Sequence, residues 1–243
     1  MIHTLPDYTT KYKLTKVFSS VDINELAARL GSIDTYDRRG NVLWWDDFNE
    51  TVNKWLVLYG GGDGTWAVDT AQPHWTKQCG KLTTDPGAAS YAEIYKRLFY
   101  PVNSIIAGEW LFAIGEKTSS IDIIIYNEFD GIAKAANLRL NVADSKFQMY
   151  NLDIHDYEDL PGGSYLFQND LSFYYPLKLS IDLANNKYKT LLFAGETYDL
   201  SDYSLTDIAS LGFDYVECGL MLTTVGGGAA VLYINGFIAT YYE

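Results

Sequence analysis

The sequence has few of the residues that hold metal ions or form disulfide frameworks. Its 243 residues include 2 cysteines and 3 histidines, and neither a His-x-x-x-His pattern nor a Cys-x-x-Cys spacing occurs. Cys79 and Cys218 lie far apart in the sequence, which leaves open whether they form one bridge or stay as two buried thiols. These absences exclude a zinc-finger type of site and a small domain held together by disulfides.

Positive charge and long apolar stretches are also scarce. The chain has 18 lysines and arginines against 31 aspartates and glutamates, which gives a formal net charge of −13. Such a chain repels nucleic acids and anionic membranes at long range. No stretch approaches the roughly 20 apolar residues that cross a bilayer, and the first residues lack the pattern of a signal peptide. We therefore expect no nucleic-acid partner and no membrane insertion.

Aromatic residues, in contrast, are abundant, with 20 Tyr, 11 Phe and 6 Trp. From residue 42 onward, apolar and polar residues alternate in short runs separated by Gly, Asn and Asp, which is typical of half-buried strands. The predicted strands are residues 42–48, 55–59, 65–68, 91–99, 110–114, 121–126, 137–142, 146–152, 177–183, 187–193, 196–200, 215–224 and 230–240. Their spacing predicts an all-β protein, a two-sheet antiparallel jelly-roll sandwich over residues 42–243.

Several connections carry predictions of their own. Asn185-Asn186 and Ala194-Gly195 suit two-residue hairpin turns at positive φ, so the three strands that they join should be adjacent and antiparallel. A last strand near the first would close the sheets and protect their edges. The glycine-rich runs at 60–64 and 226–228 are expected to be hairpin loops.

Residues 1–41 form a polar N-terminal arm with one predicted helix, at about residues 22–30. A capping box at residues 22–25 precedes it and Gly31 is placed to end it. Its apolar stripe consists of Ile23, Leu26 and Leu30, with Ala27 beside them. A helix this short is unstable alone. The stripe is therefore predicted to pack on the sandwich or to act as an assembly interface on another subunit, and the sequence leaves both open.

Short motifs resemble a known superfamily. The runs WWDDFNETVNKW (44–55), TWAVDT (65–70) and SYAEIYK (90–96) resemble the opening of concanavalin A-like lectin/glucanase and laminin G-type jelly rolls. The run LYINGFIAT (232–240), after the hairpin NNKYKTLLFAGETYDLS (185–201), resembles their final strand. The resemblance covers about 200 residues of the chain. It implies a jelly roll of the kind that lectins use.

A longer run, LAARLGSIDTYDRRGNVLWWDDFN (26–49), resembles uncharacterised structural proteins of phages and prophages. This resemblance implies a virion component, on the capsid surface or associated with the tail. The partners it implies are virion proteins or further copies of this chain in a homo-oligomer. The implied location is the virion, or the host cytoplasm before assembly.

The sequence shows no apparatus for catalysis. Retaining β-glucanases of this fold need Glu-x-Asp-x-x-Glu on one strand, and that motif is absent. The nearest acids, Asp122 and Glu128, lie six residues apart and are expected to be a solvent-edge Asp and a turn Glu beside a core strand. No Gly-x-Ser-x-Gly elbow and no phosphate-binding loop occurs. We therefore predict that the chain is not an enzyme and has no cofactor apart from a candidate structural calcium.

The candidate calcium ligands are Asp46, Asp47 and Asp69, with further acids in a loop expected at residues 153–159. Calcium prefers hard oxygen ligands such as these, although none has the spacing of a 12-residue calcium loop. Solvated acids and turn caps are the alternative. Final strands of the related modules often carry Asp-Asp-Phe where this chain has Asn235-Gly236-Phe237, so the resemblance also implies the loss of one acidic partner for calcium.

Carbohydrate binding requires aromatic platforms for sugar faces and polar groups for hydroxyls. The candidate platform residues are Trp66, Trp75, Tyr91, Tyr95 and Trp110. Alternating aromatics on strands are, however, also typical of a core. The leading hypothesis is a non-enzymatic virion structural protein, the second is a lectin-like module that binds cell-surface glycans, and a glycan hydrolase is the third.

Overall fold

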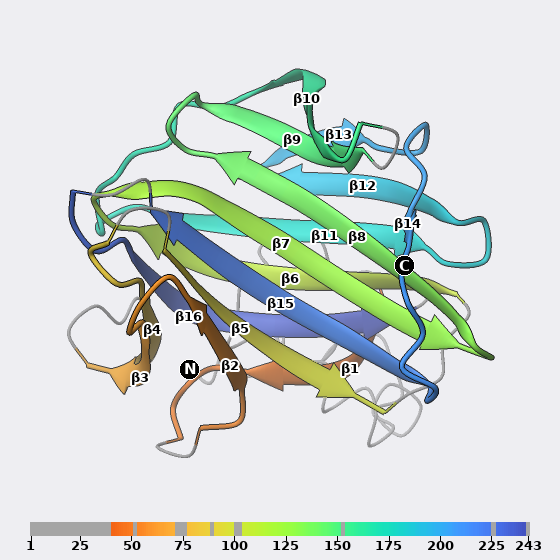
Figure 1. Ribbon diagram of the computed structural model, residues 1–243, viewed down its shortest axis with the longest axis horizontal. Helices are drawn as coiled ribbons and strands as arrows, with labels where there is room; N and C mark the ends of the chain where they lie inside the picture. Colours follow the sequence, from red (N-terminus) through yellow and green to blue (C-terminus); the bar gives the residue numbers. More distant parts are fainter. Residues whose placement is uncertain are drawn as a thin grey trace, which may run out of the picture.

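The computed structural model describes residues 40–50, 53–70, 77–87, 90–99, 104–151, 154–224 and 227–241. They form two antiparallel sheets that pack face to face (Figure 1). Sheet A runs in the order β13 (Glu196–Asp199), β12 (Lys187–Phe193), β11 (Tyr174–Asp182), β6 (Ile105–Ile114), β16 (Val231–Tyr241), β4 (Cys79–Thr83) and β3 (Thr65–Asp69), and β1 (Asn41–Asp46) pairs with β16.

Sheet B has the same number of strands and carries the candidate site. Its order is β10 (Asp156–Ser164), β9 (Lys146–Asn151), β8 (Ile132–Asn141), β7 (Thr118–Phe129), β15 (Tyr215–Thr224), β5 (Tyr91–Leu98) and β2 (Leu56–Gly60), and β14 (Thr206–Asp207) pairs with β8. Residues far apart in the chain thus meet on one sheet. The predicted all-β, two-sheet jelly roll is confirmed.

The core lies between the two sheets because each strand sends alternate side chains inward. On β7, Ile121, Ile123 and Ile125 face the core and are fully buried. Across from sheet B, Trp110 of β6 packs against Phe237 of β16 with ring centroids 5.2 Å apart. Each such aliphatic or aromatic side chain contributes roughly 1.5–3 kcal/mol on burial. The alternation that the sequence shows is therefore what fixes which face of each strand is inward.

The predicted connections have mixed outcomes. Ala194 and Gly195 have φ values of 49° and 90° and join β12 to β13, which confirms the predicted hairpin. The β11–β12 hairpin is longer than predicted, because residues 183–186 separate the two strands. Of the two predicted turn residues, only Asn186 has positive φ, at 55°. The last strand, β16, pairs with β1 as expected.

The glycine-rich runs are not hairpin loops, and that prediction is wrong. Residues 61–64 lie between β2 of sheet B and β3 of sheet A, and Gly227 and Gly228 lie between β15 of sheet B and β16 of sheet A. Each run therefore crosses from one sheet to the other. Gly62 and Gly228 have φ near 150°, a conformation that glycine adopts readily.

Three strands were not predicted, and one of them, β14, is only two residues long. β4 was missed because CGKLT is short and contains a glycine. The acidic segment expected to be a loop at 153–159 contains the start of β10, which pairs with β9 from Asp156 onward. Its acids are therefore placed by a strand register and not by a calcium loop.

The N-terminal arm, with its predicted helix and the residues Ile23, Leu26 and Leu30, lies outside the described residues. Cys79 and Cys218 are both buried, on sheets A and B respectively, and form no disulfide with each other. Within the described ranges the structure contains no helix with the length and apolar character of a membrane span.

Candidate functional site on the outer face of sheet B

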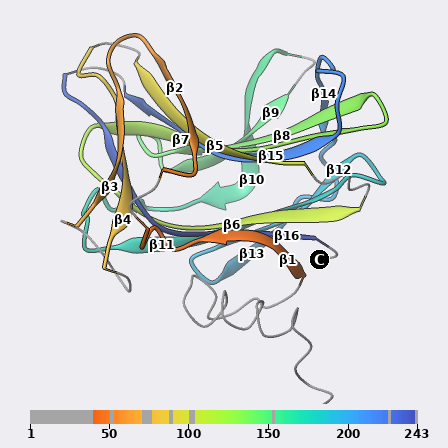
Figure 2. The same ribbon diagram turned by 90° about the horizontal axis from the view of Figure 1, so that it is seen from below.

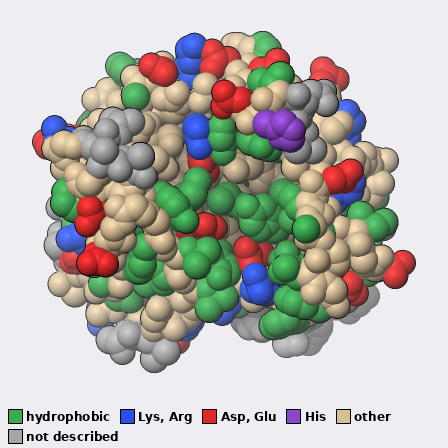
Figure 3. Space-filling model, viewed as in Figure 1, with side chains coloured by type: hydrophobic (Ala, Val, Ile, Leu, Met, Phe, Trp, Pro, Cys, Tyr) green, Lys and Arg blue, Asp and Glu red, His purple; other side chains and the backbone are tan. Residues whose placement is uncertain are grey.

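The outer face of sheet B is concave, because β2 on one side and β8, β9 and β14 on the other curve away from sheet A (Figure 2). Seen face-on, it carries a continuous region of hydrophobic and tyrosine side chains, with acidic and basic groups set among them (Figure 3). We call the outward side chains of sheet B the groove face.

A single row of residues crosses the groove face from edge to edge. Residues directly opposite in adjacent strands point to the same side of a sheet. The strand register therefore aligns Leu58, Glu93, Met221, Asp122, Arg139, Gln148 and Asp159, from β2 to β10. Three carboxyl groups and one guanidinium lie in this row, from four strands that no local sequence pattern links.

The next two rows on one side of it bring in tyrosines and a second arginine. One aligns Leu56, Tyr95, Gly219, Ile124 and Asn137, and the other aligns Arg97, Glu217, Tyr126, Ala135 and Thr206. Gly219 is confined, since a Cβ there would lie 2.9 Å from the carbonyl oxygen of Ile94. A larger residue at 219 would have to displace backbone. The surface therefore stays low at Gly219, between the rows that contain Glu93 and Arg97.

Asp122 is the anchor of the central row. Its side chain is fully buried, and its two oxygens accept hydrogen bonds from Nε and one terminal nitrogen of Arg139 at 2.7 and 2.8 Å. The hydroxyl of Tyr157 donates to the same carboxylate at 3.2 Å, and the Arg139 guanidinium lies 3.5 Å from the centre of the Tyr157 ring. Burial, and then the charge of Asp122, raise the pKa of Tyr157. This tyrosine therefore stays a neutral hydrogen-bonding group.

A second pair lies two rows away, beyond the row that contains Gly219. Arg97 donates from two nitrogens to one oxygen of Glu217, at 2.8 and 2.6 Å, and lies over the Tyr215 ring at 4.9 Å. Burial raises the pKa of Glu217 even though Arg97 acts in the opposite direction. Both arginines are thus held by a buried carboxylate and an aromatic ring at once, a geometry suited to their planar shape.

Glu93 differs from these acids because it makes no ion pair with any residue that the structure describes. It lies on β5 between Leu58 and Met221 in the central row. Burial raises its pKa to about 7, and the nearby charges of Glu217 and Asp122 act in the same direction. A carboxyl group that titrates near neutral pH inside a groove is a candidate functional group.

Tyrosines and small polar groups form a pocket of about 210 Å³ next to these charges. It is lined by Tyr126, Ala135, Asn137, Tyr150, Tyr157, Thr206 and Ile208. Burial raises the pKa of Tyr126 to about 12, so it remains a neutral donor and acceptor. The Asn137 side-chain oxygen is buried and has no hydrogen-bond partner in the structure. The pocket therefore offers aromatic surface together with an unsatisfied acceptor.

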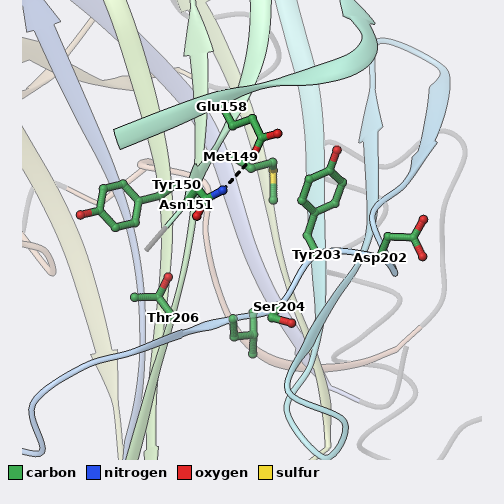
Figure 4. Close-up of a pocket in the computed structure, with 9 residues that line it drawn as sticks. Met149, Tyr150, Asn151, Glu158, Asp202, Tyr203, Ser204 and Thr206 are labelled. Carbon is green, nitrogen blue, oxygen red and sulfur yellow. Dashed lines mark hydrogen bonds between the residues drawn. The ribbon is translucent and has the colours of Figure 1, made fainter. Parts of the chain in front are cut away.

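A second pocket of about 330 Å³ lies behind the groove face (Figure 4). Met149 and Glu158 line it and point to the opposite side of sheet B from Tyr150 and Tyr157, toward Tyr203. Asn151 donates to Glu158 at 2.8 Å and holds that carboxylate in place. The aromatic depression on the groove face is therefore the smaller pocket alone.

The loop that walls this depression is fixed by Glu128 of β7. Its carboxylate accepts from the backbone nitrogens of Leu211 and Gly212, at 2.6 and 2.8 Å, and from the Ser210 hydroxyl. These hydrogen bonds, that from Ser210 first, lower its pKa. The sequence-based expectation of a solvent-edge Asp122 and a turn Glu128 was wrong, since both lie within β7 and are buried.

The predicted sugar-platform residues do not all reach this face. Tyr91 and Tyr95 lie on it, and Tyr91 is 36% exposed. Trp66 is on β3 of sheet A, where its ring packs against the core and Nε1 donates to Asn53 at 2.9 Å. Trp110 is fully buried in the core and cannot contact a sugar, so that prediction is wrong. Trp75 lies outside the described residues.

The candidate calcium ligands are not brought together. Asp46 is buried at the end of β1, where it accepts from Trp55 Nε1 at 3.0 Å and from the Phe48 backbone at 2.9 Å. Asp47 accepts from Asn49, and Asp69 pairs with Lys81 at 3.5 Å. Among the described residues no group of three or more potential ligands is arranged to hold a metal. The carboxylates are used as turn caps and ion pairs, which was the alternative interpretation.

Sequence reasoning missed most of the groove residues, although a signal was present. The run at 91–97 alternates Tyr, Glu, Tyr and Arg, and the run at 122–128 alternates Asp, Ile, Tyr and Glu. Polar and aromatic residues at every second position indicate an outer face that is neither core nor plain surface. Only the register of five strands shows that these runs share one groove.

No protein-family model and no curated protein matches the sequence. Solved structures do match. An endo-β-1,4-glucuronan lyase from the fungus Trichoderma reesei is 11% identical, with a TM-score of 0.54, covering 83% of this chain and 96% of the lyase.

A cellulose-induced protein is 10% identical, with a TM-score of 0.55, and the match covers 81% of this chain and 96% of that protein. The carbohydrate recognition domain of Emp46p matches at a TM-score of 0.45 and 13% identity, over 80% of this chain and 94% of that domain, a likeness too low to carry an argument. At these identities the comparisons concern the fold alone. They show a shared two-sheet jelly-roll fold, which the sequence resemblance implied.

Proposed function

We propose that this chain binds carbohydrate in the groove on the outer face of sheet B. The observation that carries the proposal is the pocket of about 210 Å³ beside the central row, which combines tyrosine rings with fixed polar groups. Sugars require apolar surface for their C–H faces and oriented donors and acceptors for their hydroxyls. The fold, which is shared by glycan-binding and glycan-cleaving proteins, supports the same conclusion.

Native gel electrophoresis in soluble polysaccharides tests this proposal, with a panel of glucans, mannans, xylans and galactans. Binding retards the band. Tyr150→Ala should weaken binding about fivefold or more, equal to about 1 kcal/mol, because Tyr150 lines the pocket on the groove face. Phe173→Ala is the matched control, since Phe173 is 52% exposed and lines neither pocket. Equal loss in both variants, or no retardation by any polysaccharide, would contradict the proposal.

A second candidate function is glycan hydrolysis, which the raised pKa of Glu93 favours. A carboxyl group with a pKa of about 7 is suited to general acid catalysis at neutral pH. Glu93 would give its proton to the leaving glycosidic oxygen, while a water molecule bonds to the anomeric carbon and releases a proton to bulk water. Asp122 is fully buried and both of its oxygens are bound by Arg139, so it cannot take up that proton.

This second candidate is contrary to the expectation from the missing Glu-x-Asp-x-x-Glu motif, and it has its own test. The wild-type chain is incubated with each polysaccharide that it binds, and new reducing ends are measured. Hydrolysis should be lost in Glu93→Gln while polysaccharide binding persists. Binding without any new reducing ends would reject hydrolysis, and the lectin-like role would still stand. The virion role implied by the N-terminal resemblance stays a prediction.

A further inference from the structure

We infer that the groove selects neutral glycans and rejects polyuronates and other anionic polysaccharides. This inference rests on the proposed carbohydrate binding and adds the chemical class of the ligand. It comes from the charges on the groove face. The described cations there are already paired with acids, and the half-buried Glu93 has no ion pair with any described residue.

Anionic sugars are recognised mainly by cationic side chains, and most specifically by bidentate arginine. In the described part of sheet B, three cations reach the groove face, and each has an acidic partner. Arg97 pairs with Glu217, Arg139 with Asp122, and Lys146 with Asp159. These pairs cancel in charge, so the groove has no cation left for a uronate carboxylate.

The two arginines cannot be diverted to a ligand at low cost. Asp122 is fully buried and Glu217 is 5% exposed, so removal of either arginine would leave a carboxylate out of water without a counter-charge. Breaking a buried pair in this way is strongly destabilising, because it leaves an uncompensated buried charge. The rings of Tyr157 and Tyr215 also hold the guanidinium groups in place. The arginines therefore shape the groove and orient its acids.

Glu93 provides the repulsive element. It has no cationic partner among the described residues, and the two carboxylates whose charges act on it belong to the same face. A ligand carboxylate placed in the central row would add a further negative charge to this cluster. A sugar hydroxyl, in contrast, can accept a hydrogen bond from the protonated carboxyl or donate one to the ionised form. Neutral polyols can therefore bind next to either form of Glu93, whereas an anion is repelled by the carboxylates around it.

The test compares two ligands that differ only in charge. The neutral polysaccharide that binds best in the panel is oxidised at its primary hydroxyls to give the corresponding polyuronate, and both are titrated against the full chain at pH 8 in low salt. We expect oxidation to weaken binding by tenfold or more. A polyuronate that binds as tightly as its neutral parent would overturn the inference, even though carbohydrate binding would stand. If neither ligand binds, the proposed function itself fails.

Two variants that each remove one negative charge identify the source of the discrimination. Glu93→Gln should reduce the ratio of the two affinities about threefold or more, because the unpaired acid of the groove is lost. Glu116→Gln removes the same charge from an exposed turn between β6 and β7 and should leave the ratio unchanged. Equal changes in both variants would mean that the net charge of −13 causes the discrimination, which would overturn the role given to the groove.

Discussion

The outer faces of the two sheets use charge in opposite ways. On sheet A, Glu109 and Lys178 form an ion pair at 3.3 Å in which both side chains are nearly inaccessible, in a row with the fully buried Ile238. On sheet B, two buried acids are paired with partly exposed arginines, while Glu93 has no counter-charge. A neutralised ion pair that is shut from water, such as Glu109 and Lys178, serves stability. A face with fixed, partly exposed polar groups, and with one acid that has no ion pair among the described residues, is suited to binding a ligand.

The largest effect that separates the two faces should come from Lys178→Met. It leaves Glu109 buried without its cation, so the free energy of unfolding should fall by about 3–5 kcal/mol, as measured by urea denaturation. The double variant Glu109→Leu with Lys178→Met should recover much of this loss. Polysaccharide affinity of the folded protein should not change. A loss below about 1 kcal/mol would contradict the contrast between the faces.

Arg139→Met makes the matching change on sheet B. It leaves Asp122 without its bidentate partner, and we expect a loss of about 2–3 kcal/mol, smaller than on sheet A because Arg139 is 26% exposed. Here polysaccharide binding should fall as well, since Asp122 and Tyr157 lose their orientation. Arg139→Lys keeps the charge but not the two-point geometry and should be intermediate in both measurements. If Arg139→Met bound polysaccharide as tightly as the wild type, the pair of Arg139 and Asp122 would not contribute to binding.

Glu93→Gln should give a stability difference that depends on pH. The folded-state pKa of Glu93 is about 7 against 4.5 in the unfolded chain, so the folded state binds the extra proton and wild-type stability falls as pH rises from about 4.5 to about 7. The variant has no carboxyl to ionise. It should match the wild type at pH 4 and exceed it by about 2 kcal/mol at pH 8, after allowance for solvent screening. Parallel pH profiles would show that Glu93 titrates normally.

The smallest effect is expected for Asp159→Asn at the edge of sheet B. Asp159 pairs with Lys146 in a bridge whose two side chains are about half exposed. Such pairs contribute about 0–1 kcal/mol, and salt screens them. The unfolding midpoints of variant and wild type should therefore nearly coincide in 0.5 M NaCl. A loss of stability as large as that of Arg139→Met would mean that solvent exposure does not determine how much each ion pair of this face contributes to stability.

The strand sequence of the fold could be predicted largely from local pattern. The alternation in the run at 121–126 corresponds to β7 because its isoleucines must face a core, and the Ala194-Gly195 turn follows from backbone sterics. The missed strand β10 has no such alternation, since its burial comes from pairing with β9. The crossings at the glycine runs could not be predicted, because glycine permits a hairpin and a crossover equally.

The candidate site was predicted least well. Tyr91 and Tyr95 were recognised as candidate sugar contacts, but Trp110 has the same chemistry and lies in the core. Aromatic type alone cannot show on which side of a strand a ring points, and a shift of one residue reverses it.

By itself, the sequence determined an acidic, tyrosine-rich chain of alternating strands without metal-binding or nucleophile motifs, because these properties depend on residue type and on the two-residue period of a strand. The tertiary structure alone decided which acids share a groove, which have a cation and which one is left unpaired. Glu93, Asp122 and Glu217 come from three strands that are distant in sequence, and only the register of β5, β15 and β7 places their charges within reach of one another. Electrostatic coupling depends on distance through space and on burial, and neither quantity is written in the local order of residues.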